Sequence, residues 1–468
     1  MADERDLLVL GGGPGGNAAA FAAADLGLSV TLVDAAENPG GVCLYRGCIP
    51  SKTLLHVASV LRESREIAAF GVRFGQPDID LEALRRQKDA VVGKLTGGLG
   101  QLARQRKIDY VQGRGRFLDA RRLHVDLAAG GSQEISFGSA IIATGSLPRT
   151  LPALDLQSPR VWDSTAALEL REVPKRLLVV GGGYIGAELA TVYQALGSEV
   201  TVVEVTAGLL PGVDEDLVRP LAQRLGKEMR ILLSTRVESL TETRTGLSAA
   251  LLLQDGKQEA LECEAVLVSV GRAPQTAGIG LEALGISPDA HGFLQVDAQR
   301  RTAVPNIFAI GDVAGQPMLA HKASYEGRIA AEAAAGQRSA YDPAAIPAVV
   351  FTDPEIAWAG LTEREAKERG IPIKVGRFPW GASGRATSLG RQDGITKILA
   401  DPDSGLVLGV GVAGPGAGEL IAEGVLAIEM GAVAEDIARS IHPHPTLSET
   451  VMEAAEGLIG RATHYFGR

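Results

Sequence analysis

A glycine-rich unit that occurs twice constrains the fold of this 468-residue chain more than any other feature. The first copy runs from the apolar stretch 7–10 through the glycine-rich loop 11–16 and an Ala-rich segment, 17–26, to a second apolar stretch, 29–33. The second copy repeats this order between residues 176 and 203. Buried parallel strands read as unbroken apolar runs, and G-x-G-x-x-G between a strand and a helix is typical of a dinucleotide-binding unit. The sequence therefore predicts an α/β fold with two Rossmann-like dinucleotide-binding domains.

Each glycine of the repeated loop has a distinct physical task. The first makes a tight turn, the second lets the backbone approach a pyrophosphate, and the third lets helix and strand pack closely. In the two copies these positions are Gly11, Gly13, Gly16 and Gly181, Gly183, Gly186. Reading one copy as an ordinary Gly-rich turn is disfavoured, because each copy carries every element of the unit.

An acidic residue ends the second strand of each copy, Asp34 in the first and Glu204 in the second. A carboxylate at this place accepts hydrogen bonds from a ribose diol. It also repels a 2′-phosphate, and no arginine cluster follows Glu204. The second unit is therefore predicted to prefer NAD over NADP.

Two cysteines, Cys43 and Cys48, follow the first unit at a spacing of five residues. Such a spacing lets the thiols meet across one helical turn. A bridge closing so short a loop removes little chain entropy, so it is a poor structural staple and a suitable redox switch. The competing interpretation is a pair of unpaired core cysteines.

The composition of the chain limits the classes of partner and the cellular locations that can be expected for the protein. The net charge of −10 disfavours nucleic acid and anionic membranes as partners, and no apolar run is long enough to predict a transmembrane helix. The three cysteines do not fit a secreted disulfide scaffold, and the acidic start of the chain does not fit a signal peptide. A cytoplasmic location is expected. Cys263, on an alternating stretch, is interpreted as a packed core thiol.

The segment 441–449 supplies a candidate base for thiol chemistry. A histidine paired with a carboxylate is a suitable base near neutral pH, and His444 precedes Glu449 by five residues. Thr446 and Glu449 fit a capping box, which predicts a helix starting near Thr446. Two alternatives remain: a metal site built on His442 and His444, which lacks a nearby third ligand, and a capping turn with incidental histidines. No metal is expected.

Four segments together resemble the disulfide-dependent flavoprotein reductases: GGVCLYRGCIPSK at 40–52, AIIATGS at 140–146, IFAIGDVAGQPMLAHKA at 307–323 and IHPHPTLSE at 441–449. Within that family the chain is similar to the branch that oxidises dihydrolipoamide in 2-oxoacid dehydrogenase complexes. The resemblance implies FAD and NAD as cofactors. It also implies that substrate attacks Cys43, that Cys48 passes electrons to the flavin, and that Lys52 pairs with Glu188 beside the flavin. The residues matching the family's other cofactor contacts are Gly115, Thr144, Gly145, Gly271, Asp312 and Ala320.

The resemblance further implies a homodimer in which His444, oriented by Glu449, serves the other subunit's disulfide, with lipoyl domains as partners. Expected domains are FAD binding at 1–147 and 271–340, NAD binding at 148–270 and a C-terminal α+β interface domain at 341–468. The chain departs from the usual family pattern at Asp34, Tyr45, Arg46 and Pro443, and Arg46 is expected to lower the thiol pKa values. The alternatives are another disulfide reductase of the same fold and a non-catalytic flavoprotein scaffold.

Overall fold

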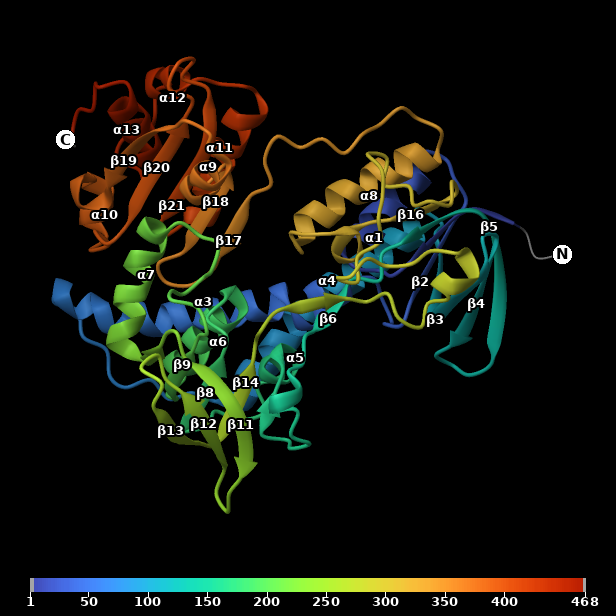
Figure 1. Ribbon diagram of the computed structural model, residues 1–468, viewed down its shortest axis with the longest axis horizontal. Coiled ribbons are helices and arrows are strands. Elements are labelled where there is room, and N and C mark those ends of the chain that lie inside the picture. The colour runs from blue at the N-terminus through green and yellow to red at the C-terminus, as the bar shows by residue number, and fades with distance from the viewer. Residues whose placement is uncertain (1–3, 466–468) are drawn as a thin grey trace.

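The computed structural model describes residues 4–465, and the three largest of its sheets each form the centre of one part of the molecule (Figure 1). In the first sheet, parallel strands lie in the order β3-β2-β1-β5-β16, and β4 joins β3 to β5 as an antiparallel meander. Its strands are β1 (Arg5–Leu10), β2 (Val30–Asp34), β3 (Asp109–Asp119), β4 (Arg122–Leu127), β5 (Ser132–Ile142) and β16 (Ile307–Ala309). Both strands of the first glycine-rich unit are therefore central in this sheet.

The second sheet repeats the arrangement for the second unit. Its five strands are all parallel, in the order β10-β9-β8-β14-β7, and a separate antiparallel sheet, β11-β12-β13, is inserted in the chain between β10 and β14. The strands are β7 (Val161–Trp162), β8 (Arg176–Val180), β9 (Glu199–Val203), β10 (Arg230–Leu232), β11 (Arg236–Glu242), β12 (Leu247–Leu252), β13 (Gln258–Cys263) and β14 (Ala265–Val268). Cys263 is buried at the end of β13, as expected for a packed core thiol.

The third sheet is antiparallel and belongs to the C-terminal part of the chain, drawn in orange to red in Figure 1. Its order is β17-β18-β21-β20-β19, with strands β17 (Ala348–Val350), β18 (Ile356–Gly360), β19 (Lys374–Pro379), β20 (Ile395–Ala400) and β21 (Val407–Ala413). Helices pack against this sheet, so the C-terminal part is α+β. The predicted fold class is confirmed.

Helices connect the strands and cover the sheets. They are α1 (Pro14–Asp25), α2 (Gly41–Arg46), α3 (Cys48–Glu66), α4 (Leu81–Gln105), α5 (Ser164–Glu169), α6 (Tyr184–Ala195), α7 (Glu215–Glu228), α8 (Ala320–Ala334), α9 (Glu363–Arg369), α10 (Gly384–Ser388), α11 (Ala417–Glu429), α12 (Ala434–Arg439) and α13 (Glu449–Leu458). Short 3-10 turns are η1 (Ile67–Phe70), η2 (Pro152–Leu154), η3 (Leu281–Leu284), η4 (Gly311–Ala314) and η5 (Trp380–Ala382). The first helix starts at Pro14 rather than at residue 17, since proline is well tolerated in a first helical turn.

The second sheet is an insertion into the first domain. The chain leaves through β6 (Ser146–Pro148) and returns through β15 (Arg272–Pro274), and these two strands pair antiparallel. After the return, β16 pairs with β5 in the original sheet and α8 packs on α1. The close approach of these helices requires glycine, because a Cβ on Gly327 would lie 2.4 Å from the carbonyl oxygen of Gly15.

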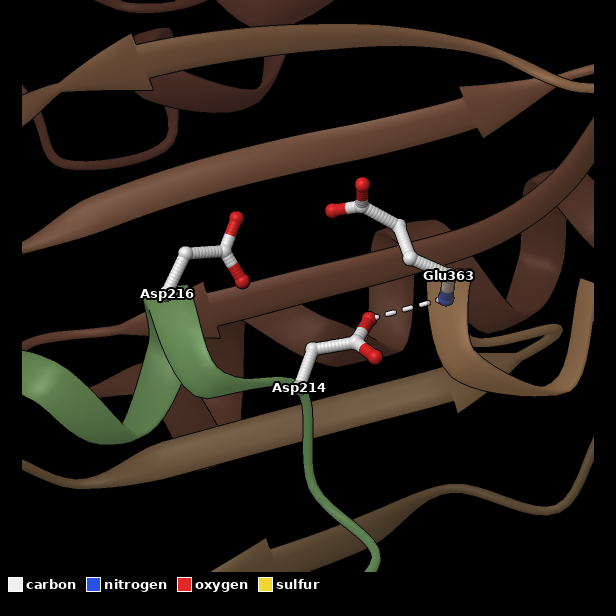
Figure 2. Close-up of side chains that lie close together, drawn as sticks. All are labelled: Asp214, Asp216 and Glu363. Atoms are coloured by element: carbon white, nitrogen blue, oxygen red, sulfur yellow. Dashed lines mark hydrogen bonds between the residues drawn. The ribbon is translucent and has the colours of Figure 1, made fainter. Parts of the chain in front are cut away.

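A buried ionic cluster joins the second unit to the C-terminal part (Figure 2). Asp214 and Asp216 at the start of α7 face Glu363 of α9, and Lys397 of β20 lies among them. The Lys397 Nζ lies 2.7, 2.6 and 2.8 Å from one oxygen of each carboxylate. The three acids could hold a cation, and the lysine ammonium already fills that role. We call these four residues the Lys397 cluster.

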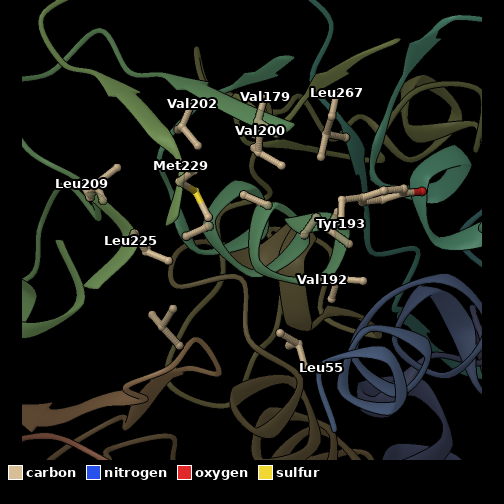
Figure 3. Packing of buried hydrophobic residues seen from close by; sticks show 14 of the residues in the cluster. Leu55, Val179, Val192, Tyr193, Val200, Val202, Leu209, Leu225, Met229 and Leu267 are labelled. Carbon is tan, nitrogen blue, oxygen red and sulfur yellow. The ribbon is translucent and has the colours of Figure 1, made fainter. Parts of the chain in front are cut away.

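The largest hydrophobic core packs around α6 and reaches into all three parts of the chain (Figure 3). Leu55 of α3 meets Val192 and Tyr193 of α6 in this cluster, and the Tyr193 hydroxyl donates to the carbonyl oxygen of Ala167 at 2.7 Å. Each large side chain so buried contributes about 1.5–3 kcal/mol. This core fixes α6, and with it the N-terminus of that helix, relative to α3.

Between residues 4 and 465 we find no helix whose length and apolar character would let it cross a bilayer.

Candidate active site

A cavity of about 870 Å³ opens between the first two units and brings most of the predicted residues together. Ligand sites of this size hold an extended small molecule. Its lining includes Cys43 and Cys48 and also Gly11, Gly13, Asp34, Lys52, Gly115, Thr144, Gly145, Glu188, Asp312 and Ala320. Gly16 lies behind the loop, where a Cβ would stand 1.8 Å from the carbonyl oxygen of Gly11. His444, Glu449 and the glycines of the second loop do not line this cavity.

The first glycine loop has the form that a pyrophosphate requires. Gly11 has φ +108°, and a Cβ there would lie 2.3 Å from the carbonyl oxygen of Ala143. Among the described residues, no side chain caps the N-terminus of α1. Its first N–H groups therefore remain available to an anion, which the helix dipole also favours. The residues present thus fit the diphosphate of FAD.

The second loop reproduces the first in detail. Gly181 has φ +106°, a Cβ on Gly186 would lie 2.0 Å from the carbonyl oxygen of Gly181, and no described side chain caps α6. The N–H of Gly182 donates to Glu204 at 2.6 Å, as that of Gly12 donates to Asp34 at 2.5 Å. Each carboxylate oxygen has two lone pairs, so these acids retain acceptor capacity toward a ribose. No Cβ contact would arise at Gly183, which leaves its backbone open to a second dinucleotide.

The two cysteines lie on different helices, which differs from the single helical turn expected from their spacing. Cys43 lies in α2, Cys48 begins α3, and Gly47 separates them. A Cβ on Gly47 would lie 2.9 Å from the carbonyl oxygen of Val42, so only glycine allows the chain to turn this tightly. Both cysteines are unbridged thiols in this structure, and both line the cavity.

The two thiols differ strongly in acidity. The pKa of Cys48 falls to about 7 because the Cys43 side chain donates a hydrogen bond to it and the Lys52 ammonium lies nearby, against the effects of burial and Glu188. The same hydrogen bond, together with burial, raises the pKa of Cys43. The pair therefore ionises first at Cys48. Lys52 is the cation that acts to lower the pKa of both thiols, and the effect expected of Arg46 stays a prediction.

Lys52 and Glu188 form an ion pair across the two units. The Lys52 Nζ lies 2.8 and 3.1 Å from the two oxygens of Glu188, whose side chain is only 4% exposed. Lys52 comes from the helix that begins with Cys48, and Glu188 lies in the second turn of α6. This pair places a charged group of each unit beside the thiols.

Sequence reasoning left Arg272 and Tyr184 without a role, yet both line the cavity. Arg272 donates to the side-chain and backbone oxygens of Ser146 at 2.7 Å, and the Ser146 hydroxyl donates to Asp312. Gly271, which does not line the cavity, turns the chain with φ +110° just before this arginine. Burial raises the pKa of Tyr184 to about 12, so its ring stays neutral. Tyr184 is a variable position of the glycine loop, and the spacing pattern alone gives no reason to select it.

His444 and Glu449 are in contact but lie apart from the thiols. The His444 Nδ1 lies 2.8 Å from Glu449, and the histidine side chain is 77% exposed. Although burial acts in the opposite direction, the Thr446 N–H and His444 lower the pKa of Glu449. This contact holds the imidazole ring through its Nδ1 and leaves its Nε2 outside the pair.

The predicted capping box forms only in part. The Thr446 N–H donates to Glu449 at 2.8 Å, but the Thr446 hydroxyl donates to the carbonyl oxygen of Pro443. Helix α13 consequently starts at Glu449 rather than near Thr446. His442 pairs with its own carboxylate, Glu423, at 2.8 Å, so the two histidines do not converge on one ligand site.

Tyr45 acts in the fold of the redox segment. Its hydroxyl donates to the carbonyl oxygen of Asn38 at 3.0 Å and accepts from the Asn38 N–H at 3.2 Å. This ring therefore ties α2 to the loop that precedes it.

Two nucleotide-type loops, a cavity between them and an ionisable thiol pair define a dinucleotide-dependent disulfide oxidoreductase. The family model described as pyridine nucleotide-disulphide oxidoreductase matches residues 5–327, and that of the family's dimerisation domain matches residues 346–455. The chain belongs to this family.

Curated relatives and solved structures narrow the comparison. The dihydrolipoyl dehydrogenase of Thermus scotoductus is 47% identical over 466 residues, covering 99% of each chain. That of Vibrio cholerae serotype O1 is 45% identical over 460 residues, covering 98% of this chain and 97% of the relative. The crystal structure of LpdA from Mycobacterium tuberculosis superposes with a TM-score of 0.88 at 29% identity, covering 96% of this chain and 99% of that one.

A solved structure of another disulfide reductase has a similar fold. The HOCl-induced flavoprotein disulfide reductase RclA from Escherichia coli, solved as a Cu(II) complex, has a TM-score of 0.84 at 28% identity, covering 95% of this chain and 98% of that one.

Proposed function

We propose that this oxidoreductase converts dihydrolipoamide and NAD⁺ to lipoamide, NADH and a proton. The observation that carries the proposal is the Cys43–Cys48 pair in a cavity that also contains an uncapped helix N-terminus and the Lys52–Glu188 ion pair. The names of the curated relatives support the choice of substrate.

The protein's own residues perform the thiol chemistry. In the oxidised enzyme, His444 takes a proton from one substrate thiol, and the resulting thiolate attacks Cys43. The Cys43–Cys48 bond breaks, and Cys48 leaves as a thiolate, for which its low pKa is suited. The second substrate thiol then attacks the mixed disulfide, which releases lipoamide and leaves Cys43 and Cys48 reduced. FAD bound in the cavity and NAD at the second loop supply the two-electron acceptors that restore the disulfide.

We assign FAD to Gly11, Gly13, Gly16, Asp34, Lys52, Gly115, Thr144, Gly145, Gly271, Asp312 and Ala320, and NAD to Gly181, Gly183, Gly186 and Glu204. The corresponding domains are 1–147 with 271–340 for FAD, 148–270 for NAD and 341–468 for the interface. Glu204 supports NAD over NADP, because its carboxylate is held by Gly182 at the place of the ribose.

The working unit is a homodimer in which His444 of one chain serves the thiols of the other. Two observations support this arrangement: His444 lies outside the cavity of its own chain, and apolar side chains near it are exposed. Ile441 is 99% exposed, and Met430 and Leu426 of the α11 region are exposed as well. An exposed apolar face of this kind marks a protein interface. Lipoyl domains of a 2-oxoacid dehydrogenase complex are the proposed partners and the cytoplasm the proposed location.

The test is an anaerobic assay of the purified protein with dihydrolipoamide, following NADH, with NADP as control. Rapid turnover with NAD and little with NADP is the expected result. A yellow protein that leaves dihydrolipoamide unoxidised would overturn the substrate and direct the search to other disulfides. A colourless protein with no affinity for FAD would overturn the flavoenzyme itself.

A further inference from the structure

A short segment of the C-terminal part reaches the Lys52–Glu188 ion pair from outside both dinucleotide units. Strand β17 ends at Val350, and Phe351 and Asp353 follow it. Asp353 holds this segment in place through three guanidinium groups, at 2.8 Å from Arg62, at 3.3 Å from Arg224, and in contact with Arg391. These arginines come from α3, from α7 and from the loop before β20, so the segment is fixed to all three parts of the chain.

Phe351 makes two contacts with the ion pair at once. Its backbone N–H donates to Glu188 Oε1 at 3.0 Å, and its ring centroid lies 4.4 Å from the Lys52 Nζ. A cation at this distance from an aromatic face is attracted by the ring quadrupole. The ring also packs against the hydrophobic core around α6, which fixes its orientation.

These contacts restrict the positions that the Lys52 ammonium can take. Glu188 holds it on one side and the Phe351 ring covers another, while Cys48 begins the helix, α3, that carries Lys52. Without the ring, water would reach this face of the ammonium and would screen its charge. The ammonium of Lys52 acts on the Cys48 thiol, and its orientation is therefore relevant to that thiol's ionisation.

We propose that Phe351 is a positioning residue that holds the Lys52 ammonium between Glu188 and the thiol pair, so that its charge stabilises a thiolate on Cys48. The inference rests on the proposed function, in which Cys48 is the leaving thiolate. It adds a residue from the C-terminal part to the thiol chemistry.

The groups that face Cys48 come from three helices. Cys43 of α2 donates a hydrogen bond, Lys52 of α3 contributes positive charge, and Glu188 of α6 contributes negative charge. The Tyr184 ring, also from α6, lies close enough to sense the Cys48 charge and stays neutral. Substitution of Phe351 by leucine keeps its N–H for Glu188 and removes only the aromatic face.

The experiment titrates Cys48 alone by the ultraviolet absorbance of the thiolate. The purified protein with its bound cofactor carries Cys43→Ser, which keeps a hydroxyl donor beside Cys48. The remaining thiol, Cys263, does not interfere, because burial raises its pKa to about 11. The variants compared in this background are Phe351→Leu, Phe351→Tyr and Trp358→Leu. Trp358 lies on β18 against the same core, so its substitution is a matched loss of an aromatic side chain.

We expect Phe351→Leu to raise the midpoint of the Cys48 titration by about one pH unit, as a cation–π contact of ordinary strength predicts. Phe351→Tyr, which keeps the aromatic face, and Trp358→Leu should leave the midpoint in place. An unchanged or lower midpoint in Phe351→Leu, or an equal rise in Trp358→Leu, would overturn the proposal. The titration uses neither dihydrolipoamide nor NAD, so failure of the proposed function in the turnover assay is a separate result.

Discussion

At the residue scale, one carboxylate at the end of the second strand of each unit binds the glycine loop beside it. Asp34 and Glu204 both accept the N–H of the second loop glycine, and both also bind a backbone N–H two residues further on. Asp34 is one methylene shorter than Glu204 and still makes the same contacts. The departure at Asp34 therefore leaves this part of the site intact.

The charge of Glu204 is predicted to set the choice between NAD and NADP. Glu204→Gln keeps an oxygen for Gly182 and removes the repulsion of a 2′-phosphate, so the ratio of kcat/KM for NAD to that for NADP should fall at least about tenfold. Steady-state kinetics with each nucleotide measures this ratio. Glu199→Gln, at the exposed other end of β9, is the matched control and should leave it unchanged. An unaltered ratio in Glu204→Gln would contradict the assignment.

At the scale of elements, the N-termini of helices differ in whether other groups of the protein already bind them. The open N-termini of α1 and α6 face the two dinucleotide loops, whereas the start of α7 is occupied by the Lys397 cluster. Lys397 is only 1% exposed, and although burial opposes the change, the surrounding carboxylates raise its pKa. The cluster thus fixes α7 to β20 and α9.

Removing the cation should destabilise this junction. Lys397→Met leaves three carboxylates close together with only the half-exposed Arg377 beside two of them, and loss of one partner from a buried pair costs about 3–5 kcal/mol. The midpoint of urea unfolding, followed by tryptophan fluorescence, should fall accordingly. Lys374→Met, at an exposed position on the neighbouring strand β19, provides the control. A midpoint equal to that of the parent protein would show that the cluster contributes little.

The same variant has a predicted pH dependence. Although burial acts to raise it, Lys397 and Arg377 lower the pKa of Asp216 from its ordinary value of 3.8. A carboxyl whose pKa is lowered in the folded state stabilises the protein above its unfolded pKa and loses this contribution as the pH falls through the folded value. The difference between Lys397→Met and the parent should therefore narrow in acid, and a difference that widened below pH 4 would contradict this explanation.

At the scale of the whole molecule, the thiols line the cavity of a chain and the candidate base, His444, lies outside it. A dimer would bring His444 of one chain to the thiols of the other. Mixed dimers test this directly. A Cys43→Ser chain and a His444→Ala chain are each inactive alone, but their mixed dimer contains one complete site. Statistical mixing should restore about a quarter of the parent activity, because half of the dimers are mixed and each has one working site. Sites built within single chains would give no recovery on mixing.

Local pattern was sufficient for the two dinucleotide units, because each of their elements depends on residues close in sequence. The thiol helices were less predictable, since the break at Gly47 arises from its contact with the Val42 carbonyl and not from spacing. The sequence predicts a start of α13 near Thr446, which is too early. In the structure the Thr446 hydroxyl donates to the carbonyl oxygen of Pro443 instead of capping the helix. Phe351 and Lys397 could not be found at all from the sequence, because Glu188 and Asp214, which they bind, lie more than a hundred residues away in the chain.

The pairing of β6 with β15 brings the two ends of the inserted second unit together. Between β6 and β15 the chain leaves the first domain once, and it returns beside the point at which it left. A unit attached in this way can be replaced without breaking any strand of the first sheet. Because Glu188 of this unit pairs with Lys52 beside the thiols, an exchanged unit must keep that carboxylate if the chemistry at the disulfide is to stay unchanged.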